Sequence, residues 1–199
     1  MIITIVGGSG SGKSEYAQNL ISALHESEYS DGRKIYLATM KCYGEEGTRR
    51  VARHLKLREN MNFETIEQTD FIDDIVASKN DVVLIEDMSN LAANAMFDRE
   101  SQDITATKES IADSTNNEKA AAEESTNEAL VSGIIEQIVS LNKKVGALVI
   151  VTNDVNRDSC GYDELTRQYI KNIAAINAAV FEMSDEVYEI VYSIGVRLK

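Results

Sequence analysis

The chain has 199 residues, 43% of them hydrophobic, and its 33 acidic against 20 basic residues give a net charge of −13. This length and apolar content predict one α/β domain, residues 1–199, with its own core and little room for a second. The acidic balance would repel a polyanion over most of the surface, so we expect no nucleic-acid partner.

The N-terminus and the cysteines favour a cytoplasmic protein. The opening MIITIVGG has no basic residue and only a short apolar run, unlike a signal peptide. No apolar stretch approaches the roughly 20 residues that a membrane span requires. Cys42 and Cys160 are far apart and have no histidine beside them, which favours two reduced thiols over a disulfide or a zinc site. We therefore expect a cytoplasmic location and no membrane span.

Apolar β-branched runs alternate along the chain with segments of helical spacing. In chain order we expect a strand at 2–6, a helix at 14–24, a strand at 34–40, a helix at 45–58 with Val51 and Leu55 on its inner face, an apolar run at 81–88, a helix at 129–144, a strand at 146–154, a helix at 163–184, and a last strand or strand pair at 187–199. This alternation predicts an α/β fold, a mostly parallel, doubly wound sheet flanked by helices.

The segment 98–128 departs from that pattern. It carries nine acids against three bases and few large apolar residues. Such a composition is typical of a solvated helix or a polar excursion without a core role, and a lid or partner-binding insertion is the alternative.

The stretch GGSGSGKS, at 7–14, fits the pattern G-x-x-x-x-G-K-[ST], directly after a buried strand and at the start of a helix. Its glycines let backbone N–H groups converge on phosphate oxygens, and the helix N-terminus adds partial positive charge. Lys13 is expected to reach the terminal phosphates, and the Ser14 hydroxyl to bind Mg²⁺. The sequence thus predicts a P-loop NTPase fold of the RecA-like type. The phosphate-binding set is Gly7, Gly8, Ser9, Gly10, Ser11, Gly12, Lys13 and Ser14.

A carboxylate on the magnesium side is expected at the end of a neighbouring strand. The run VVLIED ends in Glu86 and Asp87, which are adjacent, so only one of them can point at the loop. The alternative is that these acids only cap a buried strand where it meets water.

The run RRVARHLKLR, at 49–58, contains five basic residues and no carboxylate. On a helix, Arg50, His54 and Arg58 share one face at i, i+4 and i+8. A solvated basic face is one interpretation, and an anion-binding face for phosphate is the other. Like charges disfavour the imidazolium form of His54. A neutral imidazole among arginines suits attack on phosphorus, giving a phosphoramidate.

In these motifs the chain resembles the bifunctional adenosylcobinamide kinase and adenosylcobinamide-phosphate guanylyltransferase family of cobalamin biosynthesis. GGSGSGKS is similar to the family's GG-x-x-SGKS, YLAT (36–39) to Y-[IL]-A-T, and RVARH (50–54) to R-I-x-R-H. FETIE (63–67) is similar to W-x-T-x-E, with Phe63 in place of the tryptophan. VLIEDMSNLAANAMF (83–97) is similar to the family's acidic strand end and following helix.

The resemblance implies a kinase step on adenosylcobinamide and then GMP transfer from GTP, with Mg²⁺ as cofactor and ATP and GTP as substrates. It implies that His54 forms a covalent GMP adduct, and that the protein works in the cytoplasm as a homotrimer. With Lys13 and His54 as catalytic residues, the nucleotide site it implies beyond the loop comprises Ala38, Thr39, Met40, Arg50, Leu55, Lys56, Leu57, Arg58, Glu67 and Glu86.

Two other functions fit the P-loop. The chain could be a nucleotide-binding regulatory protein that has lost catalysis, which would bind nucleotide without turnover. It could also be a kinase of another small metabolite without a guanylyl step, which would have no use for His54.

Overall fold

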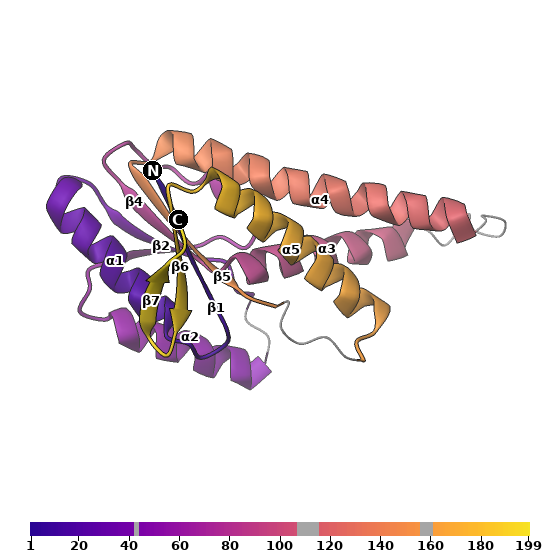
Figure 1. The fold of residues 1–199 in the computed structure, drawn as a ribbon, viewed down its shortest axis with the longest axis horizontal. Coiled ribbons are helices and arrows are strands. Elements are labelled where there is room, and N and C mark those ends of the chain that lie inside the picture. Colours follow the sequence, from indigo (N-terminus) through magenta and orange to yellow (C-terminus); the bar gives the residue numbers. More distant parts are fainter. Residues whose placement is uncertain (42–43, 107–115, 156–160) are drawn as a thin grey trace.

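The computed structural model has one seven-stranded sheet with helices on both faces (Figure 1). It describes residues 1–41, 44–106, 116–155 and 161–199. Within its helices it describes the backbone but not the side chains of 98–106, 116–123, Glu45, Glu46, Thr48, Arg50, Arg53, His54 and Leu57. Cys42 and Cys160 lie outside the described residues.

The elements follow one another as strand and helix along most of the chain. They are β1 (Ile2–Gly7), α1 (Lys13–Glu28), β2 (Lys34–Ala38), α2 (Gly44–Arg58), β3 (Glu64–Glu67), the short 3-10 helix η1 (Ile72–Asp74), β4 (Val82–Glu86), α3 (Met88–Ala106), α4 (Asn116–Lys144), β5 (Ala147–Asn153), α5 (Glu164–Met183), β6 (Glu186–Val191) and β7 (Ile194–Arg197).

The sheet order is β3-β2-β4-β5-β1-β6-β7, and every neighbouring pair is parallel except the antiparallel β6–β7 hairpin. The strand β5 therefore separates β1, which leads into the glycine loop, from β4, which ends in the two acids. Because parallel strands end at the same edge, Gly7, Ala38, Glu86 and Asn153 all lie at the carboxyl edge of the sheet. This arrangement confirms the predicted α/β class and the mostly parallel sheet.

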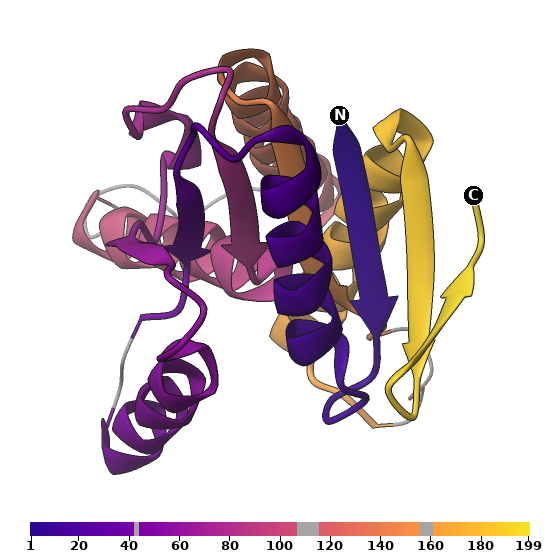
Figure 2. The same cartoon turned by 90° about the vertical axis from the view of Figure 1, so that its left-hand side faces the viewer.

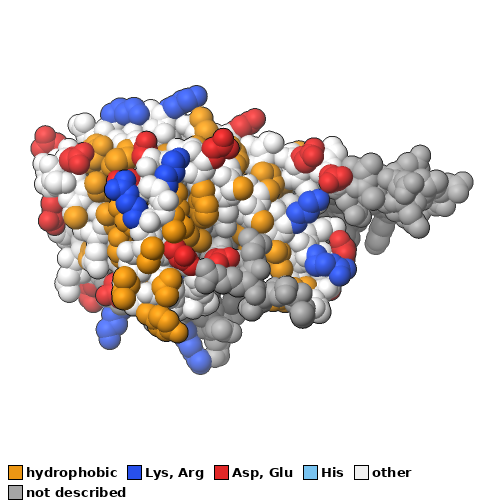
Figure 3. Space-filling model, in the orientation of Figure 1, with side chains coloured by type: hydrophobic (Ala, Val, Ile, Leu, Met, Phe, Trp, Pro, Cys, Tyr) orange, Lys and Arg blue, Asp and Glu red, His pale blue; other side chains and the backbone are white. Residues whose placement is uncertain are grey.

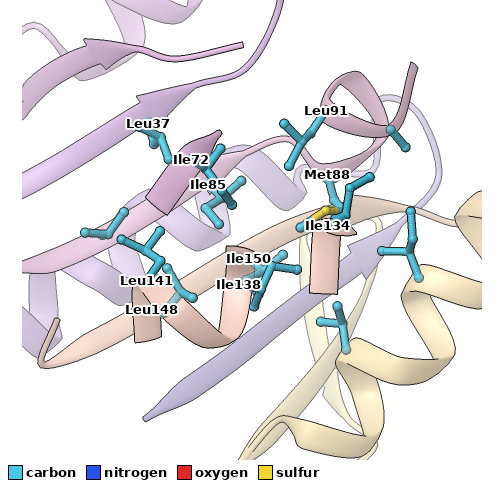
Figure 4. Close-up of a cluster of buried hydrophobic side chains, with 14 of the residues drawn as sticks. Leu37, Ile72, Ile85, Met88, Leu91, Ile134, Ile138, Leu141, Leu148 and Ile150 are labelled. Atoms are coloured by element: carbon cyan, nitrogen blue, oxygen red, sulfur yellow. The ribbon is translucent and has the colours of Figure 1, made fainter. Parts of the chain in front are cut away.

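Both faces of the central strands are buried, which explains their unbroken apolar sequences. Along β4, Val82 and Leu84 belong to the core under α1, whereas Val83 and Ile85 belong to the core on the opposite face. Helices α3, α4 and α5 cover that opposite face, and Figure 4 shows its buried side chains meeting between the sheet and α4. Burying each of these side chains contributes roughly 1.5–3 kcal/mol, an upper range because unfolded chains are already partly collapsed.

Helix α2 is set apart from these layers. In Figure 2 it lies below the sheet, beyond the carboxyl ends of the strands, and not against either face. The predicted inward packing of its apolar residues is correspondingly weak: Leu55 is 48% exposed, and both Val51 and Leu55 line a cavity instead of the core. A helix with such a basic sequence, and little apolar surface to bury, has no strong reason to join the core.

The expected strands and helices are present, and the differences concern the start of one helix and two elements that were not expected. The last segment is a strand pair, and the helix expected at 129–144 begins at Asn116. The short β3 and the helix α3 were not predicted from periodicity, because β3 is mostly exposed and α3 has few apolar residues in its second half. The backbone of the acidic segment is helical at both its ends, up to Ala106 and from Asn116, and 107–115 lie outside the described residues. Over the described parts of the chain, no helix combines the length and apolar character needed to cross a membrane.

Candidate active site

The glycine loop joins β1 to α1 at the carboxyl edge of the sheet. Gly10 and Gly12 have φ of 73° and 92°, a left-handed conformation that favours glycine. Lys13 begins α1, is only 8% exposed, and donates from Nζ to the carbonyl of Gly8 at 3.2 Å. The lysine ammonium is therefore held over the loop whose backbone surrounds the predicted phosphate position.

The serine of the motif contacts the end of β4. Ser14 Oγ donates to Glu86 Oε1 at 2.5 Å, across the width of β5. Asp87 turns elsewhere: its Oδ1 accepts from the amide of Asn90 in the first turn of α3, and its Oδ2 accepts from Asn153 Nδ2 at 3.3 Å. Of the two adjacent acids, Glu86 is thus the one at the loop.

These oxygens suit a magnesium ion. Mg²⁺ in phosphate sites takes one or two protein oxygens and completes its shell with phosphate and water. The Ser14 hydroxyl and the Glu86 carboxylate are adjacent oxygen donors of this kind. Among the described side chains no group of three or more His, Cys, Asp or Glu converges to form a fuller cage. A cation here would therefore depend on nucleotide phosphates as well as on the protein.

A cavity of about 380 Å³ lies between the carboxyl edge of the sheet and α2. It connects the end of β4, at Glu86, to the helix that carries His54. The lining residues include most of the side chains that the family resemblance places around guanine nucleotide: Ala38, Met40, Leu55, Arg58, Glu67 and Glu86.

Arg58 is the most unusual side chain of this cavity. It is 7% exposed, and its guanidinium carbon lies 3.7 Å from the centre of the Tyr36 ring. Phe63 packs edge-on against the same ring at 5.9 Å. The Arg58 atoms Nε and Nη1 are buried and have no hydrogen-bond partner among the residues that the structure describes. Buried unpaired donors are unfavourable, so this cation is well suited to an anionic or carbonyl-bearing ligand in the cavity.

Other predicted residues lie in different places. Thr39 is fully buried, and its hydroxyl donates to the carbonyl of Asp87 at 2.7 Å, so it joins the ends of β2 and β4 instead of lining the cavity. Lys56 lines a neighbouring hollow between the end of α2 and β3, together with Asn62 and Phe63. Arg50, His54 and Leu57 lie in α2, and their side chains are outside the described part of the structure.

Two buried asparagines support the site, and both lie at positions where the sequence resembles the family. Asn94 in α3 donates to the carbonyls of Thr39 and Thr69 at 2.7 and 2.9 Å, fixing the strand end beside the cavity. Asn177 in α5 accepts from Thr152 Oγ1 and donates to the Asn153 carbonyl, fixing the end of β5. The signal for both was an asparagine on an otherwise apolar helix face.

Tyr169 also belongs to this support. Burial raises the pKa of its phenol, and the hydroxyl donates to the carbonyl of Ser89 at 3.2 Å. It therefore stays protonated at neutral pH and holds the start of α3 against α5.

A glycine loop between a buried strand and a helix, with its serine on the carboxylate of a neighbouring strand, defines a P-loop nucleotide-binding protein. A family model described as cobinamide kinase / cobinamide phosphate guanyltransferase (CobU) matches residues 3–198. The chain therefore belongs to this family, as its motifs indicated.

Two curated relatives are similar over their whole length. The chain is 25% identical over 202 residues to the bifunctional adenosylcobalamin biosynthesis protein CobU of Escherichia coli, with 100% of both chains covered. It is 24% identical over 209 residues to the protein of the same name from Salmonella typhimurium, again with 100% of both covered. Among solved structures, flagellar accessory protein FlaH from Methanocaldococcus jannaschii is 14% identical with a TM-score of 0.42, over 94% of this chain and 70% of that one.

Proposed function

We propose that this protein phosphorylates adenosylcobinamide and then transfers GMP from GTP to the resulting phosphate, through a guanylyl-histidine at His54. One observation carries the proposal. A single cavity is bounded both by Glu86, which accepts a hydrogen bond from Ser14 of the P-loop, and by Leu55 and Arg58 of the helix that contains His54. This continuity supports a shared site for phosphate binding and the proposed nucleophile.

In the kinase step, the substrate hydroxyl attacks the terminal phosphorus of the nucleotide and the nucleoside diphosphate leaves. Residues 7–14 bind the phosphates through backbone N–H groups and Lys13. Ser14 and Glu86 would hold Mg²⁺, which would neutralise phosphate charge when bound. Catalysis of this kind depends mainly on positioning and on charge stabilisation.

In the guanylyl step, His54 attacks the α-phosphorus of GTP, a nitrogen–phosphorus bond forms and pyrophosphate leaves. The phosphate of adenosylcobinamide phosphate then attacks the same phosphorus, releases His54 and yields adenosylcobinamide-GDP. Arg58 is a cation of the cavity wall, and its donors, which have no partner among the described residues, support a role in stabilising the developing charge. By the resemblance, we extend the proposal to a homotrimer that works in the cytoplasm.

Labelling with GTP tests the nucleophile. The parent protein with Mg²⁺ should take label from α-labelled GTP and none from γ-labelled GTP, and the label should be lost in acid and kept in base. His54→Asn should reduce labelling roughly 10³-fold or more while leaving kinase turnover largely intact. The chain has two histidines, so His25→Asn is the matched control. The His25 ring bonds the Gly32 carbonyl, at 3.0 Å, at the end of α1, and its variant should label normally.

Lys13→Ala completes the experiment, because one P-loop serves both steps. Both kinase turnover and labelling should fall roughly 10²-fold or more in this variant. Labelling that survives in His54→Asn would contradict the proposal. Kinase turnover on another metabolite without any adduct, or binding without turnover, would favour the two alternatives instead.

A further inference from the structure

The β6–β7 hairpin has an unusual turn. Its two central residues, Tyr192 and Ser193, have φ of 50° and 63°, between the paired residues Val191 and Ile194. Two-residue turns with both φ values positive strongly prefer Asn-Gly, because the left-handed conformation is unfavourable for bulky side chains. Tyr192 is also 92% exposed, so core packing does not explain the tyrosine. A tyrosine in this unfavourable backbone conformation points to a function of the turn.

The tip of this hairpin is attached to the P-loop. The amide of Ser193 donates to the carbonyl of Ser11 at 2.7 Å. A Cβ at Gly12 would lie only 2.4 Å from Ser193 Oγ, so the turn occupies the space beside that glycine. Figures 1 and 2 both show the tip next to the β1–α1 loop, and Figure 3 shows apolar side chains gathered at this end of the molecule. The turn therefore packs directly against the glycine loop.

The geometry of the loop gives a bound triphosphate a direction. In a P-loop the metal and the terminal phosphates lie at the serine and its carboxylate partner. Here that end is marked by Ser14 and Glu86, on the β4 side of β1. The hairpin lies on the opposite side of β1, at β6 and β7. A nucleotide whose terminal phosphate faces Glu86 therefore extends its nucleoside toward Tyr192.

The guanylyl step needs a different placement. His54 belongs to α2, which borders the cavity on the β2 and β4 side, so the α-phosphorus and the nucleoside of GTP must lie there when the adduct forms. One nucleoside position cannot satisfy both steps, because the two sides lie on opposite flanks of the loop.

We propose that Tyr192 is the stacking surface for the base of the nucleotide that donates its terminal phosphate, and that the cavity under α2 takes the guanine only for guanylyl transfer. This inference rests on the proposed function for its assignment of steps. Tyr192 precedes Ser193, which contacts the loop, and its exposed phenol ring offers a flat face for a purine. Stacking of this type is tolerant of base identity.

The test compares ligands with and without a base. Tyr192→Asn removes the ring but suits the left-handed turn, so its melting temperature should match or exceed that of the parent. Its dissociation constant for magnesium AMP-PNP, a non-hydrolysable ATP analogue, should rise roughly five- to ten-fold. The KM for ATP in the kinase step should rise likewise with little change in kcat. Binding of inorganic tripolyphosphate, which has no base, and the yield of the GMP adduct should both stay unchanged.

Two further variants act as controls. Tyr192→Phe keeps the ring and should bind AMP-PNP as the parent does. Phe71→Asn removes another exposed aromatic residue with positive φ, 60% exposed and remote from the loop, and should have no effect on AMP-PNP binding.

The outcomes separate this inference from the proposed function. Unchanged AMP-PNP binding in Tyr192→Asn overturns the inference, even if kinase and guanylyl transfer are both present. An equal loss of tripolyphosphate binding also overturns it, since the turn would then act on the loop and not on the base. If the parent binds AMP-PNP but catalyses neither step, the proposed function fails while the binding comparison still decides whether Tyr192 stacks on the base. A parent that binds neither ligand would overturn both.

Discussion

Asp81 shows how one buried carboxylate joins segments that are distant in sequence. It is 2% exposed and accepts from the amides of Arg33 and Ser78 at 2.8 and 2.7 Å, and from the Arg33 guanidinium at 2.8 Å. Burial alone would raise its pKa, but the hydrogen bonds from Arg33 and Ser78 outweigh it and hold the pKa well below the usual range. The starts of β2 and β4 are fixed together in this way.

The ionised form of Asp81 should therefore stabilise the fold above the unfolded-state pKa of about 4. Asp81→Asn is expected to lower the free energy of unfolding by about 2 kcal/mol at pH 7. The difference between parent and variant should shrink as the pH falls below about 4, toward the depressed pKa of the folded state. Urea unfolding of the parent and the variant, at neutral and at acidic pH, measures the difference in their free energies of unfolding at each pH.

The second carboxylate beside Arg33 gives the control. Glu64 pairs with Arg33 at 3.2 Å, but its side chain is 47% exposed. Glu64→Gln should lower stability by less than about 1 kcal/mol, since solvent screens such pairs. Equal losses in the two variants would mean that burial does not set the contribution of Asp81.

At the scale of elements, the segments that build the site differ in how firmly they are packed against the core. The strands β1, β4 and β5 are buried on both faces, whereas α2 borders the cavity and β7 is an exposed edge strand. The rigid sheet positions Glu86 and the P-loop. The less firmly packed α2 carries His54, which suits a residue that must first attack one nucleotide and then release its GMP to another substrate.

The contact between the P-loop and the β6–β7 hairpin should be sensitive to one methyl group. Gly12→Ala places a side chain at φ of 92° and pushes a Cβ to within 3.1 Å of the Ser193 Cα. We expect a loss of about 1–3 kcal/mol in the free energy of unfolding, together with weaker nucleotide binding. Thermal unfolding and nucleotide titration measure the two effects.

Two related variants separate the causes of that loss. Gly8→Ala meets nothing within 4 Å of its new Cβ, so its folding stability should match the parent's. Ser193→Gly introduced into Gly12→Ala should recover part of the stability by removing the steric overlap, while the unfavourable φ remains. A double variant no better than Gly12→Ala would show that the hairpin does not constrain the loop.

At the scale of the whole molecule, the protein has a net charge of −13, although α2 carries a local run of basic residues. We expect no binding to duplex DNA at about 150 mM salt and roughly 10 μM protein, because the remainder of the surface repels phosphates. Fluorescence anisotropy with a labelled duplex checks this. Micromolar binding that weakens steeply with salt would show that the helix acts as a general polyanion site.

The sequence by itself determined the fold class and the chemistry of the loop. Apolar strands, helical spacing and the G-x-x-x-x-G-K-S stretch are local patterns, and local backbone and solvation preferences are enough to produce them. Which neighbouring acid faces the loop could not be predicted, since Glu86 and Asp87 differ only in partners that come from α1, α3 and β5.

Tertiary structure alone decided the relations between distant segments. It stacked Arg58 on Tyr36, buried the donors of Asn94 at two strand ends, and set the Tyr192–Ser193 turn against residue 12. Each of these contacts depends on the strand order β3-β2-β4-β5-β1-β6-β7, which is fixed by how all the strands and helices bury their apolar faces together. The motif specifies where phosphate can bind, whereas the sheet order specifies which segments border its two ends.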